Sequence, residues 1–80
     1  MNWTTENNKW VKEFVFADFI KAVEFVNKIV PLAESADHHP DIFIHSYKKV
    51  RIELITHSKG KITEKDYKLA EEIDKIIGKI

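Results

Sequence analysis

The chain of 80 residues has no cysteine, only two glycines and two prolines, and no excess of charge of either sign. Without cysteine it can have neither a disulfide framework nor a thiolate zinc cluster, which excludes a small secreted scaffold or a zinc finger. Lysine plus arginine equal aspartate plus glutamate, 13 of each, so no net field attracts the chain to nucleic acid or to an anionic membrane. Partners must therefore be inferred from individual sites.

Long apolar runs are also missing, and the first residues lack the basic and apolar regions of a signal peptide. These absences predict a soluble, cytoplasmic protein.

Hydrophobic residues make up 44% of the chain, which is enough for one small core but not for two. We therefore expect a single domain over residues 1–80.

Four segments have the composition of strands. Trp10–Phe16 mixes aromatic and β-branched residues, and the polar segment Trp3–Asn8 before it forms at best the other half of a hairpin. After Pro40, apolar and polar residues alternate from Ile42 to His45 and again from Lys49 to Ile55. This alternation predicts two antiparallel strands, joined through a turn that lacks the Asn-Gly signature of a tight hairpin.

Two segments have the periodicity of helices. The first lies between Ala17 and Ala36 and is expected to end near Asp37. Its predicted buried face consists of Phe19, Val23, Val26, Val30 and Ala33. A second apolar set widens this stripe, so the helix is expected to pack against the sheet and also against another helix or chain; this set is Ala22, Phe25, Ile29 and Leu32.

The second helix is expected to begin at Thr63, with Thr63 as the N-cap and Asp66 as its capping-box partner. Its buried stripe is predicted to contain Leu69, Ile73, Ile76 and Ile80. The predicted order is therefore strand, strand, helix, strand, strand, helix. Such a chain buries its apolar surface best as an α+β fold, with a four-stranded antiparallel sheet and two helices packed on one face.

Motifs for phosphate loops, zinc proteases and serine hydrolases are absent, but four histidines fall within a quarter of the chain: His38, His39, His45 and His57. Single surface histidines usually have no function. Three imidazoles could bind zinc with water as the fourth ligand, although adjacent histidines rarely bind one ion without strain. Acid–base chemistry without a metal fits better, because the end of the first helix favours a protonated imidazole at His38 or His39.

The spacing of the polar residues forms a longer motif. Three residues separate Glu34 from the His38-His39-Pro40 triplet, and gaps of six, nine and eight residues then lead in turn to Tyr47, His57 and Asp66. This pattern resembles the motif of the pterin-4a-carbinolamine dehydratases, and the likeness extends from Phe14–Phe19 to Leu69-Ala70.

The resemblance implies an enzyme that removes water from 4a-hydroxytetrahydropterin and yields quinonoid dihydropterin. The pterin is the substrate, so no cofactor and no metal are expected. The resemblance also implies a homodimer or homotetramer, while the zero net charge argues against a direct contact with nucleic acid or a membrane. Relatives in animals bind a homeodomain transcription factor as a dimerisation partner, so a non-enzymatic protein-binding module is the main alternative.

Carried over by position, the resemblance assigns His38 and His57 as the acid–base pair and His39 as a catalytic or pterin-positioning residue. Backbone groups near Asp37 and Thr56 are expected to bind the pterin edge, and the three imidazoles are expected to line one hollow. The remaining motif residues receive supporting roles: orientation of the His38 ring by Glu34, extended backbone at Pro40, packing at the hairpin or the pocket wall by Tyr47, and helix capping rather than catalysis by Asp66. No function is assigned to His45.

Overall fold

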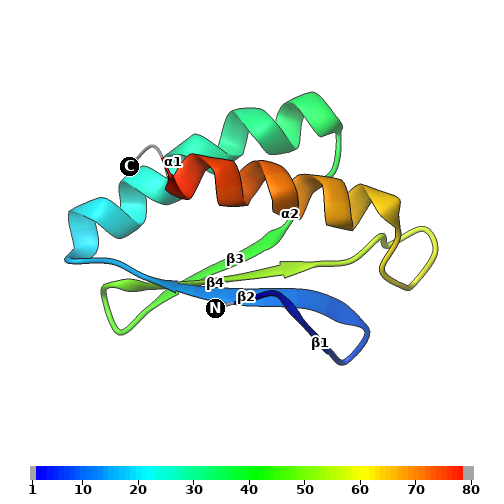
Figure 1. Ribbon diagram of the computed structural model, residues 1–80, viewed down its shortest axis with the longest axis horizontal. Coiled ribbons are helices and arrows are strands. Elements are labelled where there is room, and N and C mark those ends of the chain that lie inside the picture. Colours follow the sequence, from blue (N-terminus) through cyan, green and yellow to red (C-terminus); the bar gives the residue numbers. More distant parts are fainter. Residues whose placement is uncertain (1, 79–80) are drawn as a thin grey trace.

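The computed structural model describes residues 2–78. Its strands are β1 (Thr4–Glu6), β2 (Lys9–Val15), β3 (Asp41–His45) and β4 (Lys49–Leu54), and its helices are α1 (Phe19–Ala36) and α2 (Glu64–Ile77). The strands form one antiparallel sheet in the order β1-β2-β4-β3, and both helices lie on the same side of it (Figure 1). This is the predicted α+β fold. Within residues 2–78, neither helix is long and apolar enough to cross a membrane.

Both hairpins turn through residues with positive φ. In the β1–β2 turn these are Asn7 (φ 50°) and Asn8 (φ 65°), and asparagine tolerates the left-handed region well. In the β3–β4 turn they are Ser46 (φ 51°) and Tyr47 (φ 53°), neither of which favours it. Tyr47 lies in the hairpin turn, one of the two predicted places, and its side chain is 61% exposed there; packing against a pocket wall stays a prediction. The turn conformation, rather than burial, determines its position.

The buried face of α1 differs from the predicted one. Phe19 and Val30 are half-exposed, whereas the residues of α1 that are buried are Ala22, Phe25, Ile29 and Ala33. The reason is aromatic packing: the ring of Phe25 lies 4.8 Å from that of Phe14 and 5.0 Å from that of Phe16, between centroids. These contacts turn the second apolar set toward the sheet and leave Phe19 and Val30 on the surface, whereas Ala33 and Val26 of the first set still pack toward the core.

The second helix begins as predicted. The Thr63 side chain accepts a hydrogen bond at the helix start and the Asp66 side chain accepts one from the Thr63 backbone, which together form a capping box. Leu69 and Ile73 are buried in the core beside Val50, Ile52 and Leu54 of β4. Ile80, the last residue of the predicted stripe, lies outside the described residues.

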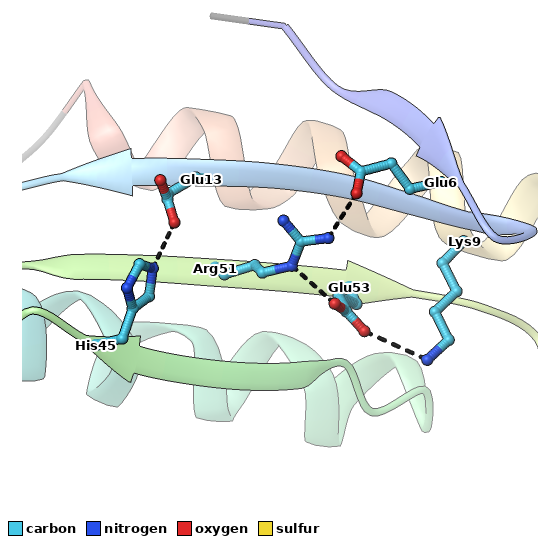
Figure 2. A network of polar contacts seen from close by, with 6 residues as sticks. All are labelled: Glu6, Lys9, Glu13, His45, Arg51 and Glu53. Carbon is cyan, nitrogen blue, oxygen red and sulfur yellow. Dashed lines mark hydrogen bonds and ion pairs between the residues drawn. The ribbon is translucent and has the colours of Figure 1, made fainter.

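The face of the sheet without helices has a network of charged side chains (Figure 2). Arg51 of β4 donates to Glu53 and to Glu6 of β1, at 2.8 Å in each case, and Lys9 of β2 donates to Glu53 at 3.3 Å. On the same face, His45 of β3 forms a hydrogen bond with Glu13 of β2. These contacts connect all four strands, and they keep His45 apart from the other histidines.

The network predicts a specific acid dependence of stability. The hydrogen bond from Arg51 lowers the pKa of the Glu53 carboxyl from its ordinary value of 4.5, with a smaller contribution from Lys9 and against the effect of burial. Because folding lowers this pKa, the stabilisation is complete above pH 4.5 and is lost as the pH falls through the folded-state value. We expect Glu53→Gln to reduce the free energy of unfolding by about 1 kcal/mol at pH 7. Urea denaturation at several pH values should show that the difference in unfolding free energy between the two proteins shrinks in acid. A difference that stays constant with pH would contradict this role of Glu53.

Candidate functional site

The segment after α1 separates the two adjacent histidines. The helix ends at Asp37, whose backbone is left-handed (φ 51°, ψ 45°). The backbone N–H groups of Asp37 and His38 donate to the carbonyls of Glu34 and Ala33, at 3.2 and 3.1 Å, which closes the helix. Beyond this reversal His38 is buried, with 9% exposure, whereas the side chain of His39 is 59% exposed. The two imidazoles therefore face different surroundings.

The His38 ring is held by a buried carboxylate. Its Nε2 lies 2.6 Å from Oδ1 of Asp66, a residue with no exposed surface. The other oxygen of Asp66 accepts hydrogen bonds from the Thr56 hydroxyl at 2.9 Å and from the Thr63 backbone N–H at 2.8 Å. Because an ionised carboxylate only accepts, Nε2 of His38 has the hydrogen, and Nδ1 is left as the nitrogen that can take up a proton.

Two threonines extend this arrangement. Thr63 Oγ1 lies 2.6 Å from Thr56 Oγ1. Since the hydroxyl hydrogen of Thr56 is already donated to Asp66, Thr63 is the donor in this pair. Thr63 in turn accepts from the backbone N–H of Lys65 at 3.3 Å. The donor and the acceptor are thus defined for each hydrogen bond around the Asp66 carboxylate. No buried side-chain nitrogen or oxygen of residues 2–78 lacks a hydrogen-bond partner.

Thr56 supports the site from within the protein. Its backbone N–H donates to the carbonyl of Lys61 at 3.1 Å, and its own carbonyl accepts from the N–H groups of Lys59 and Gly60 at 3.0 and 2.9 Å. Its hydroxyl binds Asp66. The backbone and hydroxyl groups of Thr56 are therefore all hydrogen-bonded within the protein. The predicted contact between this segment and a pterin then depends on the residues next to Thr56. The sequence did not indicate this structural role.

One predicted role needs correction, and one confirmed role needs extension. The Glu34 carboxylate is paired with the exposed His39 rather than with His38, and its Oε2 lies 2.6 Å from Nε2 of His39. The reason is that the helix ends at Asp37, so the one-turn spacing from Glu34 to His38 no longer places them together. Asp66 forms the predicted cap, but the same carboxylate also binds the His38 ring. Capping and ring orientation are combined in one residue.

The third histidine of the predicted set is exposed. His57 follows Thr56 directly, and its backbone carbonyl accepts from Gly60 at 3.2 Å. The pairing of Asp41 with Glu53 puts the segment before β3 and the segment after β4 at the same end of the hairpin. His57 therefore lies at the same end of the sheet as the neighbouring pair. That the three rings line one hollow stays a prediction.

A groove of about 430 Å³ runs between the end of α1 and the first half of α2. Its apolar lining comes from Leu32, Ala36 and Leu69, and His38 also lines it. Lysines and glutamates of α2 provide most of the charged lining. His39 and His57 are not among its lining residues. Separately, no three His, Asp or Glu side chains in residues 2–78 are gathered in a way that could hold a metal ion.

Comparison with known protein families gives a consistent result. The family model described as pterin 4 alpha carbinolamine dehydratase matches residues 1–76. A relative from Sulfolobus acidocaldarius named for pterin-4-alpha-carbinolamine dehydratase is 53% identical over 74 residues, which are 92% of this chain and 80% of the relative. A relative from Nostoc punctiforme with the same name is also 53% identical over 74 residues, which are 92% of this chain and 78% of the relative.

Two solved structures share the fold. The transcriptional coactivator/pterin dehydratase from Brucella melitensis superposes with a TM-score of 0.87 at 34% identity, covering 94% of this chain and 81% of that one. A pterin dehydratase-like protein identified as a RuBisCO assembly factor in the alpha-carboxysome has a TM-score of 0.75 at 20% identity, covering 96% and 88%. At that identity, the second comparison concerns the fold alone.

Proposed function

The chain belongs to the pterin-4-alpha-carbinolamine dehydratase family, and we propose that it catalyses the dehydration of 4a-hydroxytetrahydropterin to quinonoid dihydropterin. The observation that carries this proposal is the buried hydrogen bond between His38 and Asp66, which leaves one defined ring nitrogen for proton exchange. The pterin is the substrate, so the proposed reaction needs no cofactor. We place it in the cytoplasm, in the recycling of tetrahydrobiopterin after aromatic hydroxylation.

The chemistry needs one proton donor and one proton acceptor. The bond from C4a to oxygen breaks as the hydroxyl takes up a proton and leaves as water, while N5 loses its proton and a double bond forms between C4a and N5. One proton enters and one leaves, and no electrons are exchanged with another molecule. We assign this exchange to His38 and His57, with His39 as the residue that positions the pterin.

The other polar residues support these rings. Asp66 is a positioning residue, because it orients His38 without needing to touch the substrate. Glu34 holds His39 from the last turn of α1, at the surface. Backbone groups beside Asp37 and Thr56 remain our candidates for contacts with the pterin edge.

The direct test is a dehydration assay on the purified protein, with 4a-hydroxytetrahydropterin formed in situ and the quinonoid product followed by its absorbance. We expect a rate well above the uncatalysed one, a pH dependence in the range where histidine ionises, and no effect of a metal chelator. Absence of any acceleration would contradict the proposed activity. Inhibition by the chelator would instead favour the zinc alternative.

A second candidate function comes from the surface of α1. Phe19, Ile20 and Val30 are 54%, 67% and 51% exposed, an unusual amount of apolar surface for one helix. We propose that further copies of the chain cover this helix in a homodimer or homotetramer. Because a RuBisCO assembly factor has this fold, a non-enzymatic binding module is compatible with it. A preparation that is oligomeric in sedimentation but inert in the dehydration assay would favour that function.

A further inference from the structure

The charges that line the groove between α1 and α2 are separated along its length. Lys65 and Lys68 lie one turn apart near the start of α2, next to Asp66 and therefore at the end of the groove where His38 lies. Glu71 and Glu72 follow further along the same helix, roughly 10 Å from Lys65 to Glu72 at 1.5 Å per residue. The groove is thus positive beside His38 and negative away from it.

Within residues 2–78, the two lysines have no ion-pair partner. Neither Lys65 nor Lys68 forms an ion pair with another side chain of residues 2–78, whereas Glu72 at the opposite end is paired with Lys75 at 3.0 Å. Unpaired ammonium groups beside an apolar lining can bind a ligand that has a carbon chain and a terminal anion. The groove has the volume for such a group.

We propose that this groove receives the substituent on carbon 6 of the pterin, and that Lys65 and Lys68 select a short substituent ending in a phosphate ester. The inference rests on the proposed function. Carbon 6 is bonded to N5, the atom that loses its proton, so its substituent begins close to the reacting atoms and to His38. The apolar side chains of Leu32 and Leu69 would contact the carbon chain. Glu71 and Glu72 disfavour a long substituent with several negative charges.

The test compares two 7,8-dihydropterins that have no hydroxyl at C4a to lose: the 6-hydroxymethyl compound and its phosphate monoester. We expect the ester to bind about tenfold more tightly in low salt, with the preference decreasing as salt is added. The double variant Lys65→Gln/Lys68→Gln should bind both compounds with the affinity of the neutral one. Lys28→Gln is the matched control, because Lys28 is exposed on α1 and does not line the groove.

The affinities for the two dihydropterins decide whether Lys65 and Lys68 select the phosphate ester. Retained binding of the neutral compound by the double variant shows that its fold and pterin site are intact, so a lost preference for the ester supports the inference. Equal affinity of the unsubstituted protein for both compounds overturns the inference and leaves the proposed dehydratase function standing. Binding of neither compound overturns both. An equal loss of preference in Lys28→Gln also overturns the inference, since general charge would then explain it.

Discussion

Replacing Asp66 by alanine is expected to lower the free energy of unfolding by about 3 kcal/mol. The Asp66 carboxylate accepts hydrogen bonds from the His38 ring, the Thr56 hydroxyl and the Thr63 backbone, and alanine leaves all three donors without this acceptor. A buried donor without a partner costs about 1–3 kcal/mol, and the half of the capping box that Asp66 provides is lost as well, although the N-cap residue Thr63 stays in place. Because a domain of this size is stabilised by only roughly 5–10 kcal/mol, the loss is a large fraction of its stability. Urea denaturation measures it directly.

Two control variants separate the proposed cause from a general effect on α2. Glu64→Ala removes an exposed acidic residue of the same first turn, so it is expected to cost only a few tenths of a kcal/mol. Asp66→Asn keeps an acceptor for the two threonines, and its amide can donate to Nε2 of His38 once that ring changes tautomer. Its expected cost is about 1 kcal/mol. If Asp66→Ala cost no more stability than Glu64→Ala, the interpretation of Asp66 as the shared acceptor for His38, Thr56 and Thr63 would be wrong.

Local patterns in the sequence were sufficient for the secondary structure. The alternation from Lys49 to Ile55 predicts β4 because a strand places successive side chains on opposite faces. The start of α2 could be predicted because both halves of its capping box lie within four residues, from Thr63 to Asp66. These features depend on neighbours in the chain, and the structure agrees with them to within one or two residues.

Features that depend on tertiary packing could not be predicted in the same way. The spacing of four residues favoured Glu34 as the partner of His38, but the helix ends at Asp37 and the actual partner, Asp66, comes from 28 residues further along. Likewise, α1 has apolar side chains over more than one face, and Phe25 faces the sheet through contacts with the distant rings of Phe14 and Phe16. In each case the local spacing favoured a different candidate, because the deciding contact comes from a distant part of the chain.

Left-handed backbone in the β3–β4 turn was also invisible in the sequence. Ser46 and Tyr47 have positive φ without the glycine or asparagine that normally indicates it. The predicted position of Tyr47 at the hairpin therefore did not indicate how exposed its side chain is in this turn. The family motif identified Tyr47 as a shared position, but a motif gives no information on the backbone conformation.

Replacing His38 by glutamine is expected to lower kcat for the dehydration by about 100- to 10,000-fold, the usual contribution of a general acid or base. Glutamine can still donate a hydrogen bond to Asp66, so the fold should be retained, but it cannot take up or release a proton near neutral pH. His45→Gln changes a histidine on the opposite face of the sheet and is expected to leave the rate unchanged. Stopped-flow measurement of quinonoid dihydropterin formation compares the two variants.

The Asp66→Asn variant distinguishes proton transfer by His38 from a purely structural role. With asparagine donating to Nε2, the His38 hydrogen moves to Nδ1, and the nitrogen left free in the unsubstituted protein can no longer accept a proton. We therefore expect a folded protein with kcat reduced about 100-fold and with an altered pH profile, while KM changes little. A purely structural role for the pair predicts a normal rate and an unchanged profile in any variant that folds. That result, or full activity in His38→Gln, would remove His38 from the proposed acid–base pair.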